Sequence, residues 1–247
     1  MKLDWAREDE TIEDLQLGGL RLLQKKGGFR FGMDSVLLAD FAEIRKTDTV
    51  ADFGTGSGIL ILLLRGREKG QRYYGVEIQE EMAEMAERTA AMNGLTDIVT
   101  ILQGDAGNAT DWIPECSLDA VICNPPYGIP GSVLQSPVAS RAISRSQQED
   151  TLEKFFRSAF RTLKGRGKIS LVYPAAQMLS LMTALQKNHL EPKRFRMVYP
   201  RVNQKANMAL IEAVKDAKPG LHTMPPLIIY GEDGDLTNEL KSVYHME

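Results

Sequence analysis

The chain has 247 residues, with a hydrophobic content of 43% and a charged content of 26%, which suits a folded protein with a full core. Its net charge of −3 argues against wholesale nucleic-acid binding, and no apolar run is long enough to span a membrane. Two cysteines and three histidines without ligand spacing predict no metal site. We expect one domain over residues 1–247, and a cytoplasmic location because the acidic N-terminus lacks a signal-peptide pattern.

Residues 1–33 are predicted to form a small N-terminal extension. Two Gly-Gly pairs flank an alternating apolar segment within residues 15–31, which is typical of a small hairpin or of a strand with tight turns. Asp34 then precedes the amphipathic run Ser-Val-Leu-Leu-Ala-Asp-Phe-Ala. We expect Asp34 to be the N-cap of a helix that begins there.

A short apolar strand over residues 49–53 leads directly into a glycine turn with Gly54, Gly56 and Gly58, and a helix follows. Strand, glycine turn and helix form a nucleotide-binding unit, because glycines let a ligand approach the backbone and the helix N-terminus offers free N–H groups. Asp52 precedes the turn, and an acid there would repel a pyrophosphate. The spacing therefore favours S-adenosyl-L-methionine, which carries a sulfonium and an amine but no phosphate.

Three further predicted strands end in polar side chains. One ends at Glu77, the next leads to Asp105, and the third leads to Asn124. The carboxyl ends of parallel strands share one edge of a sheet, where ligands bind. We expect Glu77 to hold the ribose hydroxyls and Ile78 to pack on the adenine. Asp105 is expected to accept from the adenine amine, with the N–H of Ala106 nearby.

The turn Asn124-Pro125-Pro126-Tyr127 is expected to hold the methyl acceptor. Two prolines fix φ, and the residue before a proline is extended, so the turn is stiff. The side-chain oxygen of Asn124 and the carbonyl of Pro125 can each accept a hydrogen from a planar amine. These two hydrogen bonds reduce the delocalisation of the nitrogen lone pair, so that it can attack the methyl group. They also stabilise the positive charge that develops on the nitrogen during methyl transfer. Tyr127 would stack on the base.

Residues 128–149 contain two Gly, two Pro and five Ser, and we expect a mobile flap over the substrate. The last two long strands are joined by a short loop, which predicts an antiparallel hairpin. The elements expected after the flap are a helix over 152–163, a strand over 169–173, a helix over 175–188, strands over 194–199 and 208–214, an edge strand in 225–230 and a helix over 238–244.

Positive charge is concentrated between residues 141 and 205, which hold fourteen Lys or Arg and four Asp or Glu. Such asymmetry indicates an anionic partner on one face, although solvated helix faces would give the same count. A splayed or unpaired nucleobase in RNA would suit a site that grips a planar amine. The candidate RNA contacts are Arg141, Arg145, Arg194, Arg196, Arg201 and Lys205.

The motifs Asp-Phe-Gly-Thr-Gly-Ser-Gly, Gly-Val-Glu, Gly-Asp-Ala and Asn-Pro-Pro-Tyr, in this order, resemble those of class I S-adenosylmethionine-dependent amino-methyltransferases. The finer pattern is similar to the bacterial tRNA(Val) adenine-N6 methyltransferase family. The resemblance implies a Rossmann-like α/β fold: a seven-stranded, mostly parallel sheet with its last strand antiparallel and helices on both faces. It also implies methylation of an anticodon-loop adenosine, with Arg30, Met33 and Asp34 closing over the cofactor.

The chain departs from the family pattern at two positions beside the expected substrate. Gly128 stands where the family usually has a second aromatic residue after the Tyr, and Ser144-Arg-Ser-Gln replaces a basic-His-Glu element. Guanine-N2 methylation of RNA and N5 methylation of a protein glutamine remain alternatives, since both acceptors present a planar amine. A binding module without turnover and a nicotinamide dehydrogenase are the alternatives of other classes.

Overall fold

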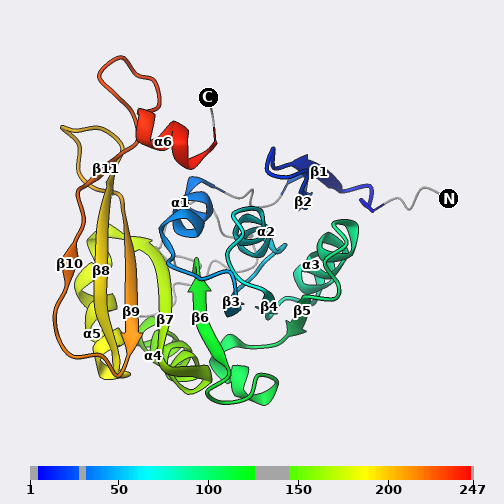
Figure 1. Cartoon of the computed structure of the whole chain (residues 1–247), viewed down its shortest axis with the longest axis horizontal. Coiled ribbons are helices and arrows are strands. Elements are labelled where there is room, and N and C mark those ends of the chain that lie inside the picture. Colours follow the sequence, from blue (N-terminus) through cyan, green and yellow to red (C-terminus); the bar gives the residue numbers. More distant parts are fainter. Residues whose placement is uncertain (1–4, 28–31, 126–144, 246–247) are drawn as a thin grey trace.

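The computed structural model describes residues 5–27, 32–125 and 145–245, with the backbone alone for 145–151. Its main sheet has seven long strands in the order β8-β9-β7-β6-β3-β4-β5, and two two-residue strands, β10 and β11, extend it by pairing with β8 (Figure 1). The strands are β3 Thr49–Phe53, β4 Arg72–Glu77, β5 Val99–Gln103, β6 Leu118–Cys123, β7 Leu163–Pro174, β8 Leu190–Tyr199, β9 Met208–Lys215, β10 His222–Thr223 and β11 Leu227–Ile228.

The strand directions confirm the expected fold class. β3, β4, β5, β6 and β7 pair in parallel, whereas β9 is antiparallel to both β7 and β8. Strands buried on both faces carry continuous apolar runs, and β6 follows this rule because its residues from Ala120 to Cys123 are all buried. The fold is therefore Rossmann-like α/β, with the last long strand reversed.

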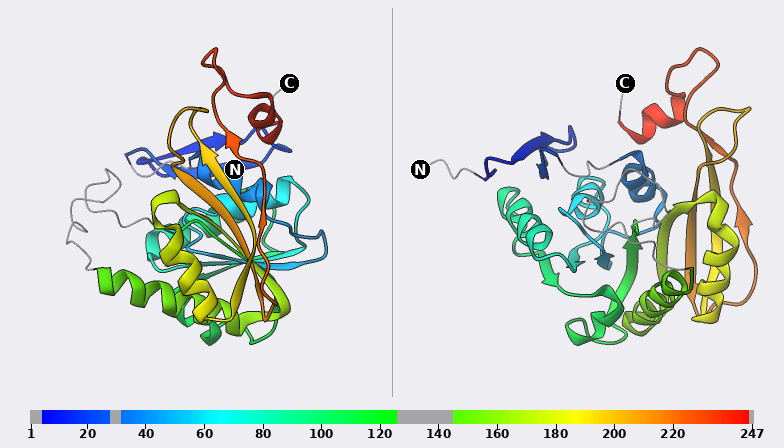
Figure 2. Two further views of the ribbon diagram at one scale, coloured as in Figure 1. Left: turned by 90° about the vertical axis from the view of Figure 1, so that its left-hand side faces the viewer. Right: turned by 180° about the vertical axis from the view of Figure 1, so that it is seen from behind.

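Helices cover both faces of the sheet, as Figure 2 shows. One core layer joins the sheet to α1, α2, the end of α3 and α6, and the other joins it to η1, α4 and α5. The helices are α1 Met33–Phe41, α2 Ile59–Gly66, α3 Glu80–Met92, η1 Ala106–Asp111, α4 Arg145–Thr162, η2 Ala175–Gln177, α5 Met178–Lys187 and α6 Asn238–Val243.

The N-terminal extension contains the expected hairpin, but its first strand begins earlier than the glycine pattern indicated. β1 Glu10–Asp14 pairs antiparallel with β2 Arg21–Lys25. The buried carboxylate of Glu10 accepts two hydrogen bonds from the Arg88 guanidinium on α3, at 2.7 and 2.8 Å. This fork-shaped pair fixes the hairpin to α3, 78 residues further along the chain.

Two expectations about helix starts are wrong. α1 begins at Met33 with Gly32 as its N-cap, so Asp34 lies inside the first turn and does not cap it. The helix therefore begins two residues earlier than the apolar run indicated. α4 begins at Arg145, so residues 145–149 of the expected flap are helical. The rest of that flap, 128–144, lies outside the described residues.

None of the described helices is long and apolar enough to cross a membrane.

Candidate functional site

The carboxyl ends of β3, β4, β5 and β6 form one edge of the sheet, called here the carboxyl edge. In the parallel register Asp52 lies beside Gly75 on one side and Ile122 on the other, and Glu77 lies beside Gln103. The chain leaves each of these strands at the same edge, so the residues that follow them converge there. This confirms the arrangement expected for the polar strand ends.

The glycine turn between β3 and α2 has a backbone that requires glycine. Gly54, Gly56 and Gly58 have φ values of 81°, 55° and 91°, in the left-handed region that side chains disfavour. Gly75 on β4 is also constrained, because a Cβ there would lie 2.9 Å from the Thr55 side chain. The turn is thus pressed onto the neighbouring strand, where the N–H groups of Gly54 and Thr55 both donate to the Val76 carbonyl at 2.8 and 3.0 Å.

Glu77 is buried, and the backbone holds both of its carboxylate oxygens. Oε2 accepts from the N–H of Gly56 at 2.9 Å, and Oε1 accepts from the N–H of Gln79, also at 2.9 Å. The carboxylate therefore links the glycine turn to the start of α3. Each oxygen has a second lone pair, so these bonds leave acceptor capacity for a ligand hydroxyl.

Asp52 is a second buried acid at the same turn. Its Oδ2 accepts from the Thr55 hydroxyl at 2.8 Å, and its Oδ1 has no hydrogen-bond partner among the described residues. Burial raises the pKa of Asp52, the Thr55 hydrogen bond lowers it, and the nearby Glu77 charge raises it. The net result of the three effects is a pKa of about 7. Two buried acids fit a cofactor without phosphate and disfavour a pyrophosphate.

The remaining cofactor candidates near β4 and β5 differ in exposure. Ile78 is 64% exposed, so a large apolar side chain stands uncovered at the carboxyl edge. Asp105 is exposed and caps η1, since its Oδ1 accepts from the N–H of Gly107 at 2.8 Å. Ala106 is half-buried at the first position of η1.

Asn124 follows β6 and contacts the first turn of α1. Its Nδ2 donates to the Oγ of Ser35 at 3.3 Å. Because α1 leads into β3 from the opposite direction, its N-terminal turn lies over the carboxyl edge, and Met33 and Asp34 lie there too. Burial raises the pKa of Asp34. Ser35 was not among the expected site residues, because nothing in the local pattern links it to a residue 89 positions away.

The structure describes only part of the expected acceptor turn. Pro125 is described and half-buried. Arg30, Pro126, Tyr127 and Arg141 lie outside the described residues.

The basic candidates divide into two groups. Arg194 contacts Glu43, the Glu212 carboxylate at 3.5 Å and the carbonyl of Phe41, and its side chain is 16% exposed. Arg196 donates to Glu239 at 2.5 Å and to the Pro225 carbonyl, with 12% of its side chain exposed.

Both guanidiniums on β8 are thus held by contacts within the fold. By contrast, Arg201 is exposed, lies 5.5 Å from the Tyr230 ring centroid and donates to the Gly231 carbonyl at 3.1 Å. Lys205 is exposed and its side chain has no hydrogen-bond or ion-pair partner among the described residues. Arg145 is the first residue of α4.

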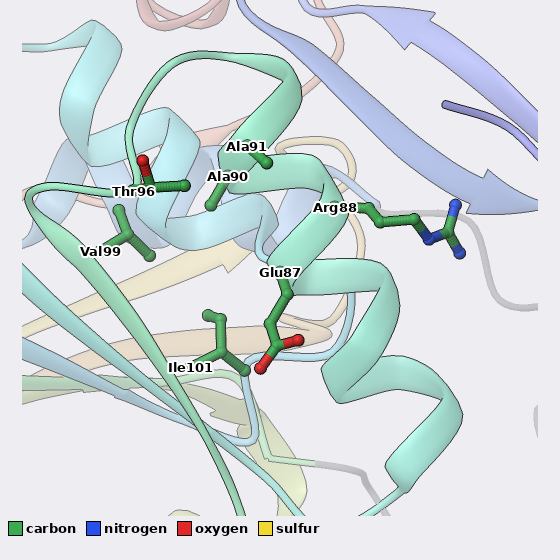
Figure 3. Close-up of a pocket in the computed structure, with 7 residues that line it drawn as sticks. All are labelled: Glu87, Arg88, Ala90, Ala91, Thr96, Val99 and Ile101. Carbon is green, nitrogen blue, oxygen red and sulfur yellow. The ribbon is translucent and has the colours of Figure 1, made fainter. Parts of the chain in front are cut away.

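A pocket of about 350 Å³ lies away from the carboxyl-edge residues, between α3 and the edge strand β5. Figure 3 shows the Arg88 guanidinium extending away from Val99 and Ile101, toward the hairpin. None of the expected site residues lines this pocket. In the described part of the chain, no three His, Cys, Asp or Glu side chains gather as metal ligands.

Comparison with known proteins decides the family. A family model described as "Methyltransferase small domain" matches residues 30–191, about two thirds of the chain. The chain belongs to this methyltransferase family. It is also 30% identical over 210 residues to the tRNA1(Val) (adenine(37)-N6)-methyltransferase of Erwinia tasmaniensis, covering 83% of this chain and 82% of that protein. The methyltransferase resembles the Parabacteroides distasonis protein of the same name at 27% identity, over 78% of this chain and 81% of that one.

The solved structures agree on the fold. A predicted O-methyltransferase, Atu636 from Agrobacterium tumefaciens, superposes with a TM-score of 0.68 at 22% identity, over 86% of this chain and 96% of that one. The expected cofactor, S-adenosyl-L-methionine, is the one that fits this methyltransferase. The glycine turn, the two buried acids Asp52 and Glu77 and the uncovered Ile78 suit that molecule.

Proposed function

We propose that this methyltransferase transfers a methyl group to N6 of an adenosine in tRNA, in the anticodon loop of a valine tRNA. The observation that carries the proposal is the convergence of Asp52, Glu77 and Asn124 on the carboxyl edge. The two tRNA1(Val) methyltransferases to which the chain is similar support the choice of adenine.

The cofactor is assigned to the glycine turn and the residues around it. S-adenosyl-L-methionine supplies the methyl group when bound. Glu77 would accept from the ribose hydroxyls, since its carboxylate is fixed by two backbone N–H groups and keeps spare lone pairs. Ile78 would pack on the adenine, which accounts for its exposure. Asp52 lies where the cationic end would be stabilised by a buried acid.

Four further residues complete the proposed cofactor site. Asp105 would accept from the adenine amine through the oxygen that does not cap η1, and Ala106 would offer its N–H. Met33 and Asp34 would close over the cofactor from the first turn of α1, where Ser35 already contacts Asn124. Arg30 would close from the same side.

Asn124 and Pro125 would prepare the acceptor amine. An exocyclic amine on a purine is a poor nucleophile because its lone pair is delocalised into the ring. The Oδ1 of Asn124 and the carbonyl of Pro125 would each accept one amine hydrogen, which draws the nitrogen toward tetrahedral geometry. The same two oxygens would stabilise the positive charge that develops on nitrogen. The surplus proton then leaves to solvent, while Pro126 stiffens the turn and Tyr127 stacks on the base.

The RNA would approach over the carboxyl edge. β9 runs opposite to its neighbours, so the loop 200–207 between β8 and β9 lies at this edge. Three strand spacings separate β6 from β8 in the sheet, or about 15 Å. We expect Arg201 and Lys205 on this loop to contact phosphates a few nucleotides from a base held at Asn124. The acids Glu232, Asp233 and Asp235 follow Tyr230 in the sequence and would limit this surface to a small footprint.

The deciding experiment is methylation of unmodified tRNA by the purified protein, with the product nucleosides identified by mass spectrometry. We expect N6-methyladenosine. N2-methylguanosine, or methyl transfer to protein glutamine in place of RNA, would contradict the choice of adenine.

The matched variant for this experiment is Asn124→Ala. It should lower kcat by at least about 100-fold, because it removes a preorganised acceptor, while the Kd for S-adenosylhomocysteine changes by less than about threefold. A parallel loss of cofactor affinity would remove Asn124 from the acceptor role.

A further inference from the structure

α1 joins the two halves of the site through a single helical turn. Met33 and Asp34 are the proposed cofactor contacts on this turn, and the next residue, Ser35, contacts Asn124. Ser35 is 2% exposed, and its Oγ accepts a hydrogen bond from Nδ2 of Asn124 at 3.3 Å. The contact joins a helix before the sheet to the end of the fourth parallel strand.

In this arrangement the Oγ of Ser35 accepts, so the NH2 branch of the Asn124 amide faces Ser35 and the carbonyl branch faces away from it. An amide group is planar and carries its two donors and its acceptor on opposite branches of one carbon. Rotation of the amide by about 180° would exchange the carbonyl oxygen for the NH2 group, and χ2 of Asn has two broad wells that allow it. A substrate amine needs an acceptor, so the flipped amide would be inactive.

We propose that Ser35 is a positioning residue that holds the NH2 of Asn124 and thereby directs its carbonyl oxygen toward the acceptor amine. The proposal rests on the proposed function, since it refines the role given to Asn124. Ser35 acts through Asn124 and makes no contact with the reacting atoms.

The C-terminal end of α1 is anchored by Lys69, which restrains the helix that carries Ser35. The Nζ of Lys69 donates to the carbonyls of Ala39, Asp40 and Ala42 at 2.8, 2.6 and 2.8 Å. These carbonyls lie at the C-terminus of α1, where helices leave acceptors without helical partners and where a cation is favourable. The helix is thus held at one end by an ammonium and meets Asn124 at the other.

The test compares Ser35→Ala with Ser170→Ala and Ser35→Thr. Ser170 is a matched control because it is 3% exposed, lies on β7 and directs its hydroxyl to Glu212 at 3.5 Å. We expect Ser35→Ala to lower kcat about 10- to 100-fold, as a misdirected catalytic group does, with the KM for S-adenosylmethionine changed by less than about twofold. Ser170→Ala should keep kcat within about threefold of the parent, and Ser35→Thr should recover most of the loss.

A second readout does not depend on turnover. The side-chain ¹⁵N amide signal of Asn124, assigned by its loss in Asn124→Asp, should shift and exchange faster with water in Ser35→Ala and stay unchanged in Ser170→Ala. An unchanged Asn124 signal in Ser35→Ala would overturn the proposal, and so would a shifted signal with an unchanged kcat. If the parent protein methylates no tRNA, the proposed function fails, while the amide signal still decides whether Ser35 orients Asn124.

Discussion

Two buried acids at the glycine turn, Glu77 and Asp52, differ in the hydrogen bonds that their carboxylates accept. Glu77 accepts from two backbone N–H groups and is satisfied as a carboxylate. Asp52, one strand away, receives only the Thr55 hydroxyl and is fully buried. Burial therefore dominates at Asp52 and raises its pKa to about 7, although the Thr55 hydroxyl bond acts in the opposite direction.

Asp52 should make the cofactor-free protein less stable as the pH rises. Its folded-state pKa of about 7 lies above its ordinary value of 3.8, so the folded protein holds this proton more tightly than the unfolded chain. The associated stability is complete below about pH 4 and is lost as the pH rises through 7. Asp52→Asn removes the titrating group, so the variant does not lose this stability as the pH rises. The difference in free energy of unfolding, variant minus parent, should therefore be larger at pH 8 than at pH 5.

The shift of about three pKa units sets an upper limit of about 4 kcal/mol on this relative gain. Urea unfolding of both proteins at the two pH values measures it. An equal difference at pH 5 and pH 8 would contradict the assignment.

At the scale of elements, strand β8 carries two arginines, Arg194 and Arg196, that form ion pairs with residues of distant segments. Alternation in the sequence correctly predicts a strand there, and the strand begins at Leu190 rather than 194. The pattern could not show that Glu43, 151 residues away, would lie against Arg194. Arg194 also stacks on the Phe41 ring at 4.3 Å, so its guanidinium supports the α1–β3 connection.

Arg194→Ala should destabilise the fold by about 3 kcal/mol, because it leaves the buried Glu212 with one cation fewer in a largely buried network. Chemical unfolding measures the change, with Arg201→Ala as an exposed control that should cost less than about 1 kcal/mol. If the folded Arg194→Ala protein binds RNA much more weakly than the parent, Arg194 contacts phosphate after all.

Local patterns therefore predict most of the elements, and pairings over long distances account for what they miss. The glycine turn, β3, β4, β5 and β6 follow from apolar runs and glycine spacing, which are local signals. The Ser35–Asn124 contact and the Arg194 network join segments far apart in sequence. The sequence predicts Asp34 as a cap because capping side chains are common at that position, yet the backbone of Gly32 precedes α1.

For the whole molecule, the reversed strand β9 decides where the basic loop lies. Its start at Met208 is at the carboxyl edge and its end at Lys215 is at the opposite edge. Lys205 therefore lies on the side of Asn124, whereas Lys218 lies on the far side of the sheet. The charge skew seen in the sequence is spread over both edges of the sheet, and two of its members, Arg194 and Arg196, are engaged in ion pairs within the fold.

The double variant Arg201→Glu/Lys205→Glu should raise the apparent KM for tRNA about tenfold or more at low salt, with little change in the KM for S-adenosylmethionine. The dependence of RNA affinity on salt should weaken as well, by about 0.7 in slope for each single-strand phosphate that the variant no longer neutralises. Lys218→Glu is the charge-matched control for the single variant Lys205→Glu and should leave both quantities unchanged. Equal effects from Lys205→Glu and Lys218→Glu would show that net charge, and not position, governs binding.

The pairing of Glu10 with Arg88 has a consequence for how the protein is made. The hairpin β1–β2 leaves the ribosome early, but its anchor on α3 is encoded 78 residues later. At about 5–20 residues per second, translation imposes a wait of roughly 4 to 16 s before Arg88 is even synthesised. During that interval the carboxylate of Glu10 cannot pair with the Arg88 guanidinium, so the hairpin can dock on α3 only after that helix has emerged. The hairpin is thus translated before the helix that holds it in place.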